Sequence, residues 1–242
     1  MQSNLGSFSF IYNPINRNTW FTVLLKKPYI PTIESFMIKL HGRLRSNYYN
    51  AVKAVLIEKQ IPFEEVIEPA PPTAEFLKLS PMAKIPCLNT DAGPITETTA
   101  IMEYIEETHS QHPLSPADPY DRAKLKELCK SMELYVEWLA RRGYGALRGE
   151  DVDEADSKAI RDGMPKAAAA VSQLTTFAPW IGGAELTYAD FFCYYMLIYA
   201  RLSTKLHAEF DLLAAIPGAQ DWFEAVAALP TMQRVIAEAK AS

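Results

Sequence analysis

The chain has 242 residues, 49% of them hydrophobic and 22% charged, with a formal net charge of −5. A chain of this length and apolar content can bury a substantial core, and it fits one large domain or two small ones. The charges are spread along the sequence and no basic run contains interleaved aromatic residues, which argues against a nucleic-acid partner.

The cysteines and the apolar runs narrow the class of protein further. Cys87, Cys129 and Cys193 are far apart and form no CxxC pair, which argues against a disulfide framework, a structural zinc site or a dithiol centre. The longest apolar run, 191–200, is half of the roughly 20 residues that a membrane-spanning helix needs. We therefore expect a protein of the reducing cytoplasm, with no metal and no membrane partner.

Residues 1–36 do not share the pattern that follows. They mix polar residues and prolines with scattered aromatics, and their longest compact apolar stretch, 20–25, is too short for a signal-peptide core. We expect an N-terminal extension, either a non-essential or disordered segment or a short element that docks locally.

Strand and helix signals alternate from Met37 onward. Apolar residues at helical spacing predict an amphipathic first helix, and a right-handed crossover would make the strands on either side of it parallel. The expected elements are strands at 37–41 and 63–67 around a helix at 48–60, an irregular segment with room for a short helix at 69–80, strands at 86–89 and 93–96, and a helix at 98–108. This βαβ unit followed by ββα is the order of a thioredoxin-like domain.

The remainder of the chain reads as helical. Pro116 and Pro119 interrupt the pattern, so we expect a domain at 37–114, a linker at 115–120 and an all-helical domain at 121–242. A long helix with one continuous apolar face is predicted from residues at three- and four-residue steps, namely Leu125, Leu128, Cys129, Met132, Tyr135, Val136 and Leu139. Further helices are expected at 160–174, 187–206, 219–229 and 231–239. The predicted fold class is α/β plus all-α, with a helical bundle as the second domain.

One motif in the second domain predicts a structural role. Thr187 and Asp190 have the spacing of a capping box, and Leu186 with Phe191 can form the hydrophobic staple beside it. We expect these residues to start a buried helix rather than to bind a ligand.

Two segments of the first domain predict a binding site for a small acidic peptide. Pro86 interrupts a strand-like run, and if its peptide bond is cis, the backbone of Ile85 can turn outward and pair with a peptide ligand. Glu97 and Thr98 stand where a helix begins, and the unpaired N–H groups of a first helical turn favour a carboxylate.

The two segments, in this order, resemble the glutathione-binding half of the cytosolic glutathione transferases, and the resemblance covers residues 37–242. It implies that Ile85, before a cis Pro86, pairs with the cysteinyl backbone of glutathione, and that Glu97 and Thr98 hold the γ-glutamyl end. It also implies a homodimer with glutathione as co-substrate and a role in detoxification. The Thr187–Asp190 motif is similar to the start of the family's buried sixth helix.

The resemblance also implies where the glutathione thiol is activated. Ser46 matches the serine of bacterial-type members, and a hydroxyl that donates to the sulfur could lower the thiol pKa from about 8.5 by roughly one to two units. Ser46 is equally a good N-cap, and Asn47, Tyr48 and Tyr49 compete for the donor role. Asn47 is also expected to contact glutathione.

The remaining site predictions concern the glycine carboxylate of glutathione and the electrophile. Lys84 can pair with the glycine carboxylate of glutathione, with a solvated surface lysine as the alternative. Tyr48, Tyr135 and Trp138 are the candidates for the hydrophobic electrophile site. The predicted activity is a glutathione transferase, and the alternatives are a glutathione-dependent isomerase or peroxidase and a noncatalytic glutathione- or partner-binding protein.

Overall fold

A four-stranded mixed sheet opens residues 37–241, the part of the chain that the computed structural model describes. Its strands are β1 (Ile38–Gly42), β2 (Phe63–Ile67), β3 (Cys87–Thr90) and β4 (Gly93–Thr96), in the order β2-β1-β3-β4. β1 runs parallel to β2 and antiparallel to β3, which pairs antiparallel with β4. The expectation for residues 1–36 lies outside the described residues.

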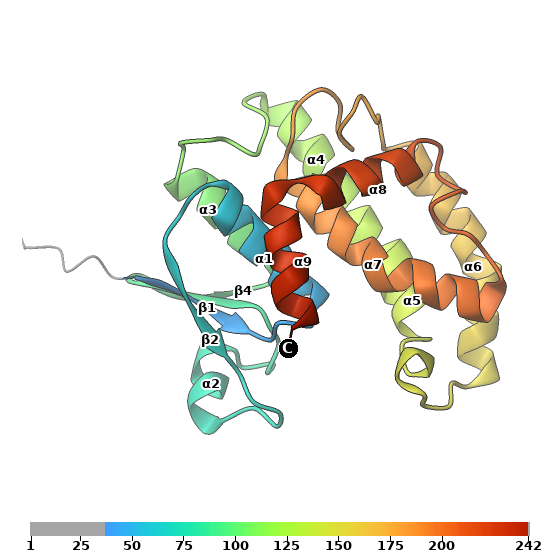
Figure 1. The fold of residues 1–242 in the computed structure, drawn as a ribbon, viewed down its shortest axis with the longest axis horizontal. Helices are drawn as coiled ribbons and strands as arrows, with labels where there is room; N and C mark the ends of the chain where they lie inside the picture. The colour runs from blue at the N-terminus through green and yellow to red at the C-terminus, as the bar shows by residue number, and fades with distance from the viewer. Residues whose placement is uncertain (1–36, 242) are drawn as a thin grey trace, which may run out of the picture. The chain divides into compact units, whose positions relative to one another are not determined.

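Three helices complete the first domain. α1 (Asn47–Glu58) and α3 (Thr98–Thr108) lie on one side of the sheet, and the short α2 (Ala74–Leu79) lies on the other (Figure 1). Leu40 and Leu88, which face each other across β1 and β3, are fully buried and belong to the same core as α1. The predicted thioredoxin-like order is confirmed, including the short helix within 69–80.

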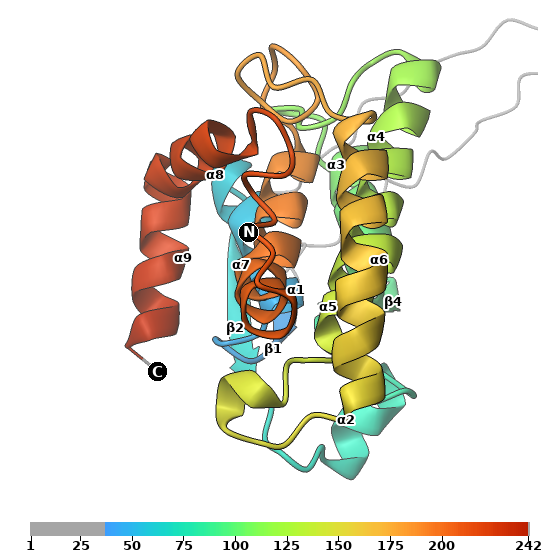
Figure 2. The same ribbon diagram turned by 90° about the vertical axis from the view of Figure 1, so that its right-hand side faces the viewer.

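The second domain is helical, as predicted. A continuous helix comprises α4 (Pro119–Ser131), the π-helical turn η1 (Met132–Glu137) and α5 (Trp138–Arg141), and a 3₁₀ turn η2 (Ala146–Arg148) follows it. The others are α6 (Glu154–Ser172), α7 (Tyr188–Ala208), α8 (Ala219–Ala228) and α9 (Pro230–Lys240). α7 lies between α9 and α6 in Figure 1 and in Figure 2.

α4 begins within the segment predicted to be a linker. Pro119 occupies the first helical turn, where its fixed φ suits the helix and its missing N–H leaves no bond unmade. The Asp118 carboxylate accepts from the amides of Tyr120 at 2.8 Å and Asp121 at 3.1 Å, and so caps the helix. The boundaries 37–114, 115–120 and 121–242 remain predictions.

The continuous apolar face predicted for this long helix is wrong at Tyr135. Tyr135 is 60% exposed, whereas Glu137 is fully buried and Glu133 is 9% exposed. The amide of Trp138 donates to the Glu133 carbonyl, five residues back, so this turn holds one residue more than an α-helical turn. The extra residue moves Tyr135 out of the buried stripe and carries Glu137 into it.

The predicted cap of α7 is present and fully buried. Asp190 Oδ2 accepts from the Thr187 amide at 2.8 Å and from the Thr187 hydroxyl at 3.0 Å. Asp190 Oδ1 accepts from the Ile181 amide and from Trp222 Nε1, both at 2.8 Å. Asp190 therefore joins α7 to α8 and to the loop before α7, which is a structural role.

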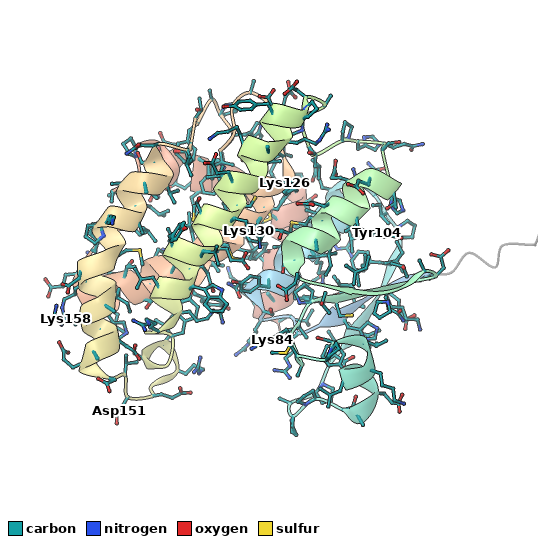
Figure 3. The ribbon with its side chains drawn as sticks, turned by 180° about the vertical axis from the view of Figure 1, so that it is seen from behind. Lys84, Tyr104, Lys126, Lys130, Asp151 and Lys158 are labelled. Atoms are coloured by element: carbon teal, nitrogen blue, oxygen red, sulfur yellow. The ribbon has the colours of Figure 1, made fainter. Side chains whose placement is uncertain are left out.

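Ion pairs connect the two domains. Lys53 of α1 is 1% exposed and its ammonium pairs with Glu65 of β2 at 2.6 Å and with Glu238 of α9. Lys126 of α4 pairs with Glu103 of α3 at 3.0 Å, and Figure 3 shows Lys126 on the side of α4 that faces α3. The sheet domain and the helices thus form one body with a shared core.

No helix in residues 37–241 has the length and apolar character that crossing a membrane requires. No group of His, Cys, Asp and Glu side chains in that range could hold a metal ion.

Candidate active site

A cleft of about 910 Å³ lies between the sheet domain and the helices. Both domains contribute to its walls, so it exists only because the ion pairs and the shared core hold them together. Its lining includes every predicted site residue except Tyr135, namely Ser46, Asn47, Tyr48, Lys84, Ile85, Pro86, Glu97, Thr98 and Trp138.

The loop before β3 presents its backbone to the cleft. The Ile85–Pro86 peptide bond is cis. Neither the amide nor the carbonyl of Ile85 pairs with another residue in 37–241, although Pro86 and the strand after it are buried. The Ser80 hydroxyl holds this loop by accepting from the Lys84 amide at 3.0 Å and donating to its carbonyl at 2.8 Å. The loop thus offers one donor and one acceptor to an extended peptide.

The start of α3 has a strained residue beside the cleft. Glu97 occupies the N-cap position with φ of 69°, a conformation that residues other than glycine rarely adopt. Such strain is found preferentially where a ligand is held. The Glu97 side chain is exposed and makes no capping bond, and the Thr98 side chain behind it is buried. A carboxylate and a helix N-terminus therefore stand together, ready for an amine and an acid on one ligand.

The Ser46 hydroxyl caps α1 with its oxygen and still has its proton free to donate. Its Oγ accepts from the Tyr49 amide at 3.3 Å, which makes it the N-cap of the helix. The hydroxyl proton has no acceptor among the described residues, and the side chain lines the cleft. Capping uses the oxygen as an acceptor and leaves the O–H free to donate.

The competing donors near Ser46 are already used. Glu137 accepts from the Tyr48 hydroxyl at 3.0 Å and from Asn47 Nδ2 at 3.3 Å. The Tyr49 hydroxyl donates to Glu65 at 2.5 Å. Burial, and then the charge of Glu137, raises the pKa of the Tyr48 phenol, while burial and the bond to Glu65 raise the pKa of Tyr49. Neither phenol would ionise near neutral pH. Of the three hydroxyls at Ser46, Tyr48 and Tyr49, only that of Ser46 has an uncommitted proton, and Asn47 uses one of its two amide N–H groups.

Lys84 lines the cleft from the sheet domain, and Trp138 lines it from the helical domain. Figure 3 shows Lys84 on the side of the sheet domain that faces the helices, and its ammonium has no carboxylate partner within residues 37–241. Trp138 is 59% exposed at the start of α5. Tyr135, predicted to share this wall, is 60% exposed but lies outside the cleft lining. It falls within the π turn, whereas Trp138 follows that turn.

Sequence reasoning missed Arg141 in the helical wall of the cleft, and it missed Glu137, which is fully buried and lies outside the lining. Glu137 and Arg141 stand four residues apart, a spacing that predicts an ion pair on a helix. No pattern in the sequence indicated that this pair would face the protein interior, because that orientation depends on the π turn.

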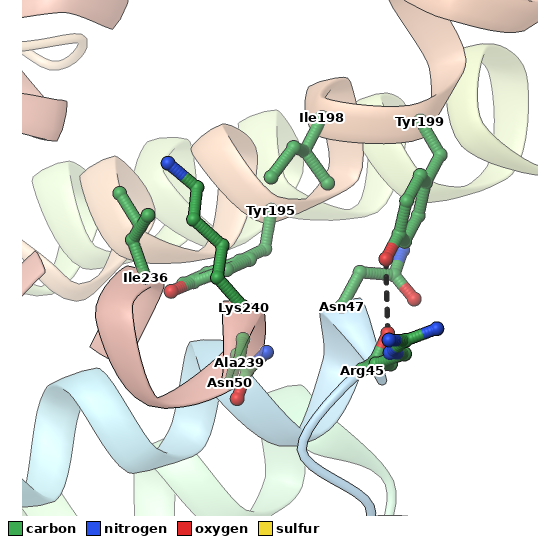
Figure 4. A pocket seen from close by; sticks show the side chains of 9 residues that line it. All are labelled: Arg45, Asn47, Asn50, Tyr195, Ile198, Tyr199, Ile236, Ala239 and Lys240. Atoms are coloured by element: carbon green, nitrogen blue, oxygen red, sulfur yellow. Dashed lines mark hydrogen bonds between the residues drawn. The ribbon is translucent and has the colours of Figure 1, made fainter. Parts of the chain in front are cut away.

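A smaller cavity of about 410 Å³ adjoins the cleft, between α1, α7 and α9. The Tyr199 hydroxyl donates to the Arg45 carbonyl at 3.0 Å, as Figure 4 shows. Arg45, Asn47 and Tyr199 line both spaces, so this bond lies at their boundary.

Comparisons with known proteins agree with this architecture. Residues 40–113 match the family model of the glutathione S-transferase N-terminal domain, and residues 136–225 match that of the C-terminal domain. A glutathione S-transferase of Pseudomonas putida is 38% identical over 207 residues, which are 85% of this chain and 94% of that protein.

Solved structures show the same fold. A Tau class glutathione S-transferase from mango, Mangifera indica, has a TM-score of 0.68 at 24% identity, covering 84% of this chain and 96% of its own. A holo structure of maleyl pyruvate isomerase, a bacterial Zeta class glutathione S-transferase, has a TM-score of 0.65 at 22% identity, covering 81% and 95%. The chain belongs to the glutathione S-transferase family. It is a transferase with glutathione as its co-substrate.

Proposed function

We propose that Ser46 activates the thiol of glutathione for attack on an apolar electrophile in the cleft. The observation that carries this proposal is the free hydroxyl proton of Ser46, in a segment where the Tyr48 hydroxyl and one N–H of the Asn47 amide donate to Glu137. The same cleft contains the peptide-binding features at Ile85 and Glu97.

Glutathione would lie along the sheet side of the cleft. Its cysteinyl amide and carbonyl would pair with the Ile85 backbone, and its α-amino group would meet the Glu97 carboxylate. The γ-glutamyl carboxylate would accept from the first turn of α3 at Thr98, where the amides are unpaired. The glycine carboxylate would pair with Lys84. Each charged group of the tripeptide then has a complementary partner.

The thiol of glutathione must lose its proton before it can react as a nucleophile. At a pKa of about 8.5 only a few per cent of glutathione is thiolate at neutral pH, and the thiolate is the nucleophile. A hydrogen bond from Ser46 to the sulfur, together with the N-terminus of α1, stabilises the anion and lowers that pKa. The thiol proton goes to solvent, and the thiolate then forms a bond to the electrophilic carbon. Tyr48 and Trp138 provide the aromatic surface against which an apolar electrophile would pack.

Titration of bound glutathione tests the role of Ser46. In Ser46→Ala the thiol pKa, followed by thiolate absorbance, should rise by about one to two units, and the rate at pH 7 should fall about 10- to 100-fold. Ser46→Thr keeps both the hydroxyl and the cap and should retain most of the activity. An unchanged thiol pKa in Ser46→Ala would exclude Ser46 from activation. Glutathione binding without turnover of any electrophile in a broad panel would leave a noncatalytic binding protein.

The cytoplasmic location, the detoxification role and the homodimer are further parts of the proposal. All three cysteines are free and buried, which supports a reducing compartment. Leu134 and Tyr135 are adjacent on η1 and 50% and 60% exposed, and this apolar pair supports self-association through the outer face of the long helix. Sedimentation velocity of the purified chain decides between a monomer and a dimer.

A further inference from the structure

Arg141 is held in the cleft by a buried carboxylate. Glu137 is fully buried by the π turn, and its Oε2 accepts from Arg141 Nε at 3.1 Å while its Oε1 accepts from Arg141 Nη2. A two-point pair of this kind fixes the plane of the guanidinium as well as its position. Burial alone would lower the pKa of Arg141, but the bonds and charge of Glu137 outweigh it and raise that pKa.

Two aromatic rings lie close to the same guanidinium. Its central carbon lies 5.3 Å from the ring centroid of Tyr48 and 5.2 Å from that of Tyr144, both within the range of cation–π attraction. Tyr48 is itself bonded to Glu137, so the four side chains support one another. The guanidinium is therefore oriented before any ligand arrives.

The Nη1 edge of the Arg141 guanidinium is unpaired among the described residues. Its Nη1 group has no acceptor within residues 37–241, the side chain is 44% exposed, and it lines the cleft together with Ser46. Four cations, Arg43, Arg45, Lys84 and Arg148, line the cleft against Glu97 and Glu133, and of these Arg148 is paired with Glu150 at 2.7 Å. An unpaired N–H pair on a fixed guanidinium in the wall of such a cleft is suited to an oxygen on which negative charge develops.

We infer that Arg141 binds an oxygen of the electrophile and stabilises the charge that builds on it, so that α,β-unsaturated carbonyl compounds are the substrate class. This inference rests on the proposed function, since it needs a thiolate near Ser46. Glu137 is the positioning residue for Arg141. Because Glu137 balances the full charge of Arg141, the pair offers directed donors rather than strong attraction for a ready-made anion. It therefore favours a neutral carbonyl that becomes charged during the reaction.

The reaction balances without any further reagent. The glutathione thiol loses its proton to solvent, and the thiolate sulfur forms a bond to the β-carbon while the C=C electrons move to give an enolate oxygen. Arg141 donates to that oxygen. Water then returns one proton to the α-carbon, and the product is the saturated thioether.

Two electrophiles of similar size separate this role from a general effect. 4-Phenylbut-3-en-2-one forms an enolate on addition, whereas benzyl bromide loses bromide and develops no oxyanion. In Arg141→Met we expect kcat/KM for the enone to fall about 100-fold and that for benzyl bromide to fall less than about threefold, with the KM for glutathione unchanged. Ser46→Ala should lower both rates.

Controls address folding and local charge. Glu137→Gln with Arg141→Met leaves no unpaired buried carboxylate and should show the same selective loss if the single variant does not fold. Arg142→Met removes the next arginine, which pairs with Asp156 at 3.4 Å and lies outside the cleft lining, and should change neither rate.

The outcomes are distinct. A selective loss of the enone rate supports the inference. Equal losses for both electrophiles in the folded variants would leave Arg141 only a structural role and overturn it, as would a wild-type protein that accepts the halide and not the enone. A protein that binds glutathione but turns over neither electrophile would overturn the proposed function itself.

Discussion

The two walls of the cleft are specified in different ways. The sheet-side wall depends on short backbone features: the turn at Ile85–Pro86, the strained Glu97 at the start of α3, and the Ser46 cap of α1. The helix-side wall depends on Trp138 and Arg141, whose positions follow from the π turn that ends at Glu137, directly before Trp138. The wall proposed to bind glutathione is therefore predictable from a few consecutive residues, whereas the wall proposed to meet the electrophile is not.

Asp190 is an exception to this contrast, because it lies in the helical domain and yet belongs to a short local motif. Its substitution should have the largest effect on stability. Asp190 is a local motif that the sequence predicted, yet it is fully buried and accepts four hydrogen bonds. Asp190→Ala leaves the donors of Thr187, Ile181 and Trp222 buried without a partner. We expect the free energy of unfolding, measured in urea, to fall by about 3–5 kcal/mol.

A second cap in the same domain provides the control. Asp153 caps α6 by accepting from the Ala155 amide at 2.8 Å, but its side chain is exposed. Asp153→Ala should cost about 1 kcal/mol, because water can replace the lost bond. Equal losses at the two sites would mean that Asp190 acts as an ordinary cap and that its links to Ile181 and Trp222 contribute little.

A substitution at Glu97 should affect only the sheet-side wall. Glu97→Ala removes the carboxylate proposed to hold the α-amino group of glutathione, and a lost charge-assisted bond of about 1.5–3 kcal/mol corresponds to roughly 10- to 100-fold weaker binding. Calorimetry should show this rise in the Kd of glutathione, and the KM of the electrophile should stay constant.

Glu107, exposed in the last turn of α3, is the matched control for Glu97. Glu107→Ala changes the net charge by the same amount without touching the cleft, and glutathione should bind it as it binds the wild type. Comparable weakening in both variants would point to a long-range charge effect and would remove Glu97 from the site.

Most of the fold could be predicted from the sequence, because the hydrophobic periodicity and the Pro and Gly residues place the ends of the elements at the same positions. β2, β4 and α3 fall on the predicted residues, and α6 runs through Pro165 as expected. The start of α4 was missed because Pro119 reads equally as a helix stop and as a first helical residue. The inward turn of Glu137 could not be predicted, since a three- and four-residue step assumes a uniform helix and a single π turn breaks that assumption.

The smallest expected effect tests the consequence of that π turn directly. Trp138 and Tyr135 are aromatic, three residues apart and almost equally exposed, at 59% and 60%, but only Trp138 lines the cleft. Trp138→Ala should remove about 1 kcal/mol of apolar contact and raise the KM of an aromatic electrophile roughly fivefold, while Tyr135→Ala should change it less than about twofold. Steady-state kinetics at saturating glutathione measures both. A larger effect at Tyr135 would mean that the helix keeps an α-helical register in solution and that the electrophile wall is the one predicted from spacing alone.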